Sequence, residues 1–117
     1  MSDTGYEKAL DQVTRVRGVR GAMLVSLEDG LMVADLLLEG IKGSAVAALA
    51  ASLGRRLQSA LGAGGAGDPV FWHLQCEQGA LLAVPTAEAM LVVAVTDPDV
   101  NVGLVRLELL RAAEAVA

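Results

Sequence analysis

The stretch ALLAVPTAEAMLVVAVT, residues 80–96, decides the fold. It contains two aliphatic runs, Ala80–Pro85 and Met90–Thr96, and the residues between them, Thr86–Ala89, are typical of a short turn. A connection this short joins antiparallel strands, because parallel strands need a long crossover. Both runs are apolar at nearly every position, which predicts strands that are covered on both faces of the sheet.

Three further strands extend this pair. The run Val70–Cys76 precedes it across a short turn, so the three strands form an antiparallel meander. Nearer the N-terminus, Ala22–Leu27 and Leu31–Leu37 flank Asp29-Gly30. Asp-Gly between aliphatic runs predicts a hairpin, because glycine readily adopts the positive φ that tight hairpin turns require.

Three helices separate and flank the strands. Apolar residues recur at helical spacing from Tyr6 to Val16, and two more helices are predicted over Ser44–Leu61, with Ser44 as N-cap, and over Val102–Val116, capped by Asp99 or Asn101. The order α-β-β-α-β-β-β-α predicts a mixed α/β (α+β) fold in one domain, residues 1–117. We expect a five-stranded antiparallel sheet with the second helix on one face and the first and third on the other.

The second helix has two contrasting faces. One carries an aliphatic stripe, which we expect to pack on the sheet, and the other is small and mostly uncharged, which suits the close approach of another helix. The stripe comprises Val46, Leu49, Ala50, Leu53, Leu57 and Leu61, and the small face Ala47, Ala48, Ala51, Ser52, Arg55, Gln58 and Ser59.

The composition excludes several classes of protein. Hydrophobic residues make up 54% of the 117 residues, which argues against disorder, and no apolar run approaches the roughly 20 residues of a membrane-spanning helix. The formal net charge of −5 argues against nucleic acid as a partner, since phosphate binding needs a basic surface. Because the chain is more apolar than a lone small domain needs, we expect an oligomer interface.

Catalytic and metal-binding patterns are not found in the sequence. The single histidine, His73, and the single cysteine, Cys76, cannot supply a metal-ligand set, and no serine lies in a nucleophile-elbow motif. The glycine-rich run at residues 62–67 follows a helix and lacks a subsequent Lys-Ser/Thr, so we interpret it as a connector. We therefore expect no enzyme activity, cofactor or metal. With one cysteine and a polar N-terminus, we expect a cytoplasmic location.

Four stretches taken in order resemble the roadblock (dynein light-chain) domain family. They are Val16–Ser26, Asp29–Ala34, the alanine-rich helix with Leu53-Gly54, and Asn101–Arg106. The resemblance runs from about Tyr6 to Val116, and the sequence is most similar to the prokaryotic, MglB-like subgroup. It implies a roadblock/profilin-like fold of the architecture expected above.

The resemblance also implies a dimer. Family members pair the third strand of each protomer, here Val70–Cys76, into one continuous sheet, and the two second helices then lie side by side. An exposed apolar edge strand needs such a partner, although plain core packing would equally explain the two aromatic residues in this strand. The implied interface residues are Val70, Phe71, Trp72, His73, Leu74, Ala48, Ala51 and Ser52.

The function implied by the family is a platform for small Ras-like GTPases. In the MglB-like subgroup, associated with gliding motility and cell polarity, the dimer is a GTPase-activating protein. The implied docking residues are Arg55, Arg56 and Ser59, although arginine also suits a solvated helix C-terminus. Because the sequence stops soon after the third helix, a scaffold role is favoured over stimulated hydrolysis. The alternative is a structural assembly subunit that pairs with another roadblock protein; a small-molecule sensor is less favoured.

Overall fold

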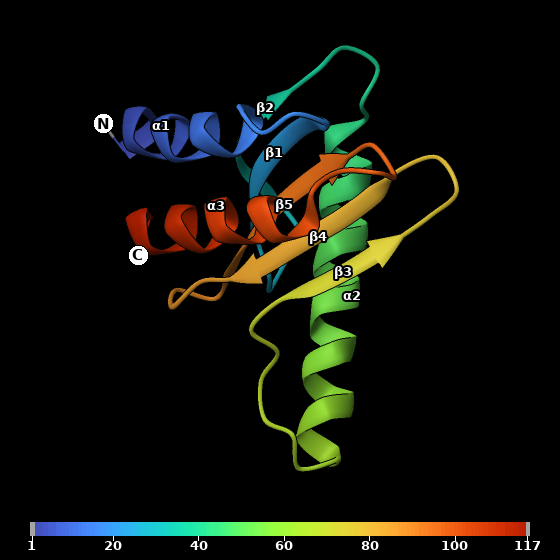
Figure 1. Cartoon of the computed structure of the whole chain (residues 1–117). Helices are drawn as coiled ribbons and strands as arrows, with labels where there is room; N and C mark the ends of the chain where they lie inside the picture. Colours follow the sequence, from blue (N-terminus) through green and yellow to red (C-terminus); the bar gives the residue numbers. More distant parts are fainter. Residues whose placement is uncertain (1, 117) are drawn as a thin grey trace.

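The computed structural model describes residues 2–116, with side-chain exposure from residue 5 onward. The predicted order of helices and strands is confirmed (Figure 1). The elements are α1 (Ser2–Thr14), β1 (Val19–Ser26), β2 (Met32–Leu37), α2 (Gly43–Ala63), β3 (Trp72–Gln75), β4 (Ala80–Pro85), β5 (Met90–Thr96) and α3 (Val102–Ala115).

The five strands form one antiparallel sheet, as the hairpin spacing predicted, and their order in the sheet is β2-β1-β5-β4-β3. The two aliphatic runs that decide the fold are the neighbours β4 and β5, in which Leu82 lies opposite Ala94. The β1–β2 hairpin and the β3–β4–β5 meander thus join where β1 pairs with β5. This leaves β2 and β3 as the two edge strands.

Helices cover both faces of the sheet in the predicted arrangement, with α1 and α3 on one face and α2 on the other (Figure 1). The side chains of successive residues in β1 pack on opposite faces of the sheet, because strand side chains alternate between faces. Ala22 and Leu24 pack beneath α1 and α3, whereas Met23 and Val25 pack against α2. Continuous apolar strands therefore build two cores, one on each face of the sheet.

The predicted orientation of α2 is wrong, because the face that packs on the sheet combines members of both predicted faces, namely Ala47 and Ala51 of the small face and Ala50 of the aliphatic stripe. The buried residues of this helix are Ala47, Ala50, Ala51 and Gly54, whereas Leu49 is 51% exposed and Leu53 and Leu57 are only partly buried. The reason is the size of the side chains that the sheet presents. A Cβ at Gly54 would lie 2.8 Å from Leu27 Cδ1 and 3.2 Å from Leu91 Cδ1, so only a small residue fits.

The boundaries of several elements also differ from the prediction, most clearly those of α2 and β3. The helix α2 begins at Gly43 with Lys42 in the N-cap position, and Ser44 provides no cap. By contrast, Asn101 caps α3 as predicted, since its Oδ1 accepts the Leu104 N–H at 3.0 Å. The strand β3 is shorter than the run Val70–Cys76, because only Trp72–Gln75 pair with β4.

Candidate interaction surface

The edge of β3 that faces away from β4 has unpaired backbone groups. The turn after β3 closes with the Cys76 N–H donating to Gly79 O at 2.8 Å. Hydrogen-bonded pairs alternate along an antiparallel ladder, so Leu74 and Trp72 bond to β4, and the N–H and C=O of His73 and Gln75 point outward. These groups can pair with another strand.

The side chains of β3 alternate between the two faces of the sheet. Trp72 packs into the core beneath α2, and Leu74, on the same face, is 42% exposed. On the opposite face, Phe71 packs with the α1–α3 core just before the strand begins, while His73 and Gln75 are exposed. Val70 precedes the strand and is 70% exposed.

The helix α2 passes across the sheet and continues beyond β3 (Figure 1). No residue of this helix after Gly54 is buried, so its last turns lie outside the core. Helical periodicity places Leu53 and Leu57 on the side opposite Ala48 and Arg55, which adjoin the β1–β2 turn. We name the exposed and partly buried apolar surface on this face the α2–β3 surface; it comprises Leu49, Leu53, Leu57, Trp72 and Leu74.

Trp72 has an unusual environment within this surface. Its indole Nε1 is buried and has no hydrogen-bond partner, and it is the only such side-chain atom among the described residues. A buried donor without a partner costs free energy, and such atoms are rare in native proteins. Because Trp72, the single tryptophan of the chain, is only partly buried and lies on the edge strand β3, a partner that pairs with this edge would change its surroundings.

Arg55 is held by the protomer itself. Its Nη1 donates to Leu27 O at 2.7 Å and to Glu28 O at 3.3 Å, which fixes α2 to the β1–β2 turn. In that turn Gly30 has a φ of 74°, as the Asp-Gly pair predicted, and the Leu31 N–H donates to Asp29 Oδ1 at 3.1 Å. This bond, followed by one from the Ser26 side chain, lowers the pKa of Asp29.

The structure changes the predicted set of site residues on α2. Ala51 is fully buried in the protomer and has no surface to offer a partner, and Ala48 lies beside Gly30, away from β3. The guanidinium of Arg55 is engaged, whereas Arg56 and Ser59 are exposed. Sequence reasoning missed Leu49, Leu53 and Leu57, because a leucine stripe is the usual signal of a helix's buried face.

One further surface feature lies elsewhere. A depression of about 400 Å³ between α1 and α3 is lined by Lys8, Ala9, Arg111 and Ala112 among others, and Arg111 pairs with Glu108 at its rim. Among the helices within residues 2–116, none combines the length and apolar character needed to cross a bilayer.

The sequence matches the Roadblock/LC7 domain family over residues 5–95. Two uncharacterised proteins of Methanocaldococcus jannaschii are 32% and 31% identical to it, over 99% and 94% of this chain and 97% and 95% of theirs.

Solved structures share the fold. The gliding protein MglB from Thermus thermophilus has a TM-score of 0.88 at 24% identity, covering all of this chain and 89% of that one. A structure described as MglB with tetrameric arrangement has a TM-score of 0.87 at 27% identity, covering all of this chain and 90% of that one. MglC from Myxococcus xanthus is less similar, with a TM-score of 0.67 at 18% identity, covering 96% of each chain.

Proposed function

Because this chain belongs to the Roadblock/LC7 domain family, we propose that it is a dimeric scaffold or regulator that binds a small Ras-like GTPase. The observation that carries the proposal is the open, uncharged edge of β3 beside the α2–β3 surface, where Leu49 is exposed and Leu53 and Leu57 are partly buried. An apolar edge of this kind favours pairing with another chain. The family resemblance supplies the GTPase as the class of partner.

In the proposed dimer, the β3 strands of two copies pair antiparallel and make one continuous sheet. The α2–β3 surfaces of the two protomers then meet, and Leu49, Leu53 and Leu57 of each helix are covered by its partner. Burial of leucine side chains at this contact is favourable by about 25 cal/mol per Å² of apolar surface, and this gain opposes the entropy lost on association. His73 and Leu74 remain in the predicted interface, with Val70 and Phe71 at its ends.

The proposed docking surface for the GTPase is the side of the paired α2 helices that faces away from the sheet. Arg56 and Ser59 are exposed there, and the helix carries no acidic residue. We infer a partner surface that offers carboxylates to Arg56. Such charge complementarity chiefly raises the association rate.

The oligomeric state is measured by size-exclusion chromatography with light scattering. We expect a dimer at micromolar concentration, with a change in Trp72 fluorescence on dilution. A monomer throughout this range would refute the pairing of β3 strands.

The GTPase part is tested with a purified Ras-like GTPase encoded near this chain's gene, loaded with GTP. We expect binding by the wild-type dimer, and about tenfold weaker binding after Arg56→Glu. Faster phosphate release would identify a GTPase activator, and binding with unchanged release would identify a scaffold. Failure to bind would favour the alternative function, an assembly subunit that pairs with another roadblock protein.

A further inference from the structure

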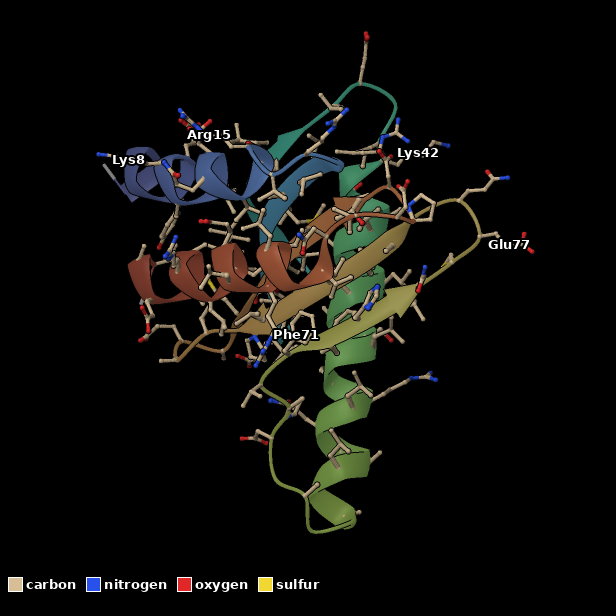
Figure 2. The ribbon with its side chains drawn as sticks, in the orientation of Figure 1. Lys8, Arg15, Lys42, Phe71 and Glu77 are labelled. Atoms are coloured by element: carbon tan, nitrogen blue, oxygen red, sulfur yellow. The ribbon has the colours of Figure 1, made fainter. Side chains whose placement is uncertain are left out.

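The face of β3 opposite α2 is also uncovered. His73 and Gln75 are exposed on this face, and α3 lies to one side, over β4 and β5. Phe71 lies between the start of β3 and α3 (Figure 2), with the Arg106 guanidinium 5.4 Å from its ring centre. One protomer therefore forms a ledge, with β3 as its floor and α3 as its single wall.

We propose that, in the dimer, two such ledges form one docking site for a single acidic helix of a partner protein. This inference rests on the β3 pairing proposed above. Pairing places the second α3 across the β3 seam from the first. Each α3 lies over β4 and β5, so the two helices are four strand spacings apart, ~19 Å. A helix midway between them would lie about 8–10 Å from each α3, which is the usual distance between the axes of packed helices. The space therefore holds one helix.

The charges of the site indicate an acidic occupant. Arg106 takes part in none of the ion pairs among the described residues, whereas Arg15, Arg20 and Arg111 each have a carboxylate partner. The Arg106 side chain projects from α3 toward β3, as its contact with Phe71 shows. The dimer would thus present one unpaired guanidinium from each wall, above a floor that carries two copies of His73. The nearest carboxylate on the same side of α3 is that of Glu114, two turns farther along the helix, where it lies beside Val70 before β3 begins.

The symmetry of the site fixes the stoichiometry. A helix lying over the seam occupies space that belongs equally to both protomers, so one helix binds per dimer. A peptide that bound each α3 independently would give two per dimer. The site is distinct from the proposed GTPase surface, because the sheet separates it from α2.

The test uses a fluorescein-labelled amphipathic peptide of alanine, leucine and glutamate, about 18 residues long so that it can form a helix. A second peptide has lysine in place of glutamate. Fluorescence anisotropy should show that wild-type protein binds the glutamate peptide at least ~10-fold more tightly than the lysine peptide. Titration at high concentration should saturate at one peptide for every two chains.

Two variants of α3 separate the site from general charge effects. Arg106→Glu should reverse the preference between the two peptides, whereas Arg111→Glu, on the side of α3 that faces α1, should leave it unchanged. Equal effects of the two variants, or two peptides per dimer, would overturn the inference. If light scattering shows a dimer that binds neither peptide, this inference alone fails; if the protein is a monomer, the proposed function fails as well.

Discussion

The two edge strands of the sheet, β2 and β3, differ in how well they are protected against pairing with another strand. Both α1 and α2 pack against β2, and its pairing with β1 is irregular at Val33, an extra residue opposite the step from Leu24 to Val25. The exposed Asp35, two residues after Val33 in β2, places a carboxylate on this edge. By contrast, β3 pairs regularly with β4, and its four residues carry no acidic, lysine or arginine side chain.

This difference identifies which edge is suited to pairing. Bulges and charged side chains on edge strands are the means by which proteins prevent strand addition. The strand β2 has both, and β3 has neither, although each edge exposes an aliphatic residue to a similar extent: Val33 is 43% exposed and Leu74 is 42% exposed. The apolar exposure alone would not have distinguished the edges.

The largest expected effect comes from placing a charge on the β3 edge. Leu74→Lys should weaken the dimer on the order of 100-fold, because two lysines would be brought together and desolvated in the interface. Sedimentation equilibrium measures the dissociation constant. The matched control is Val33→Lys on the β2 edge, which should leave the dimer intact.

Folding of both variants is checked by circular dichroism, since each substituted side chain is substantially exposed in the protomer. If Val33→Lys dissociates the protein and Leu74→Lys does not, the roles assigned to the two edges are reversed.

A smaller effect is expected where α2 is fixed to the β2 side of the sheet. Arg55→Ala removes the hydrogen bonds to Leu27 O and Glu28 O and should lower the free energy of unfolding by about 1 kcal/mol. Urea denaturation in the Leu74→Lys background measures this without a contribution from dimerisation. Arg56→Ala is the control and should change stability by less than ~0.5 kcal/mol. Equal losses would show that the Arg55 bonds do not stabilise the fold.

The smallest effect concerns the turn that leads into β2. Hydrogen bonds from the Leu31 N–H and the Ser26 side chain lower the pKa of Asp29 in the folded protein, so its ionised form stabilises the fold at neutral pH. This contribution is lost as the pH falls through the folded-state pKa. Asp29→Asn should therefore be slightly less stable than wild type at pH 7, and urea denaturation at decreasing pH should show the two converging. A pH-independent difference would contradict this linkage.

The strands and their order along the chain were predictable because their signals are local. The short turns at Asp29-Gly30 and Thr86–Ala89 require antiparallel neighbours, and the apolar runs require two covered faces. The length of β3 was not predictable, because Val70 and Phe71 are as apolar as the residues that pair. Whether they join the ladder depends on the path of the preceding connector.

The candidate site was predictable in part. The strand residues His73 and Leu74 lie on an exposed edge, as the resemblance implied. On α2, the predicted division into faces was wrong, since Ala47 and Ala51 of the small face are buried whereas Leu49 of the aliphatic stripe is exposed. A helical pattern gives the direction of its two faces but not the size of the side chains that each will meet.

The sequence by itself therefore determined the antiparallel sheet, its two helical layers and the family of the chain, because periodicity and turn chemistry act over a few residues. Only the tertiary structure decided which face of α2 is buried and which edge of the sheet is open. Leu27 and Leu91, far from α2 in sequence, fill the space beneath Gly54 and turn the leucines outward. Part of the apolar area that the protomer leaves exposed, at Leu49 and Leu74, thus lies on the α2–β3 surface, where a partner can cover it.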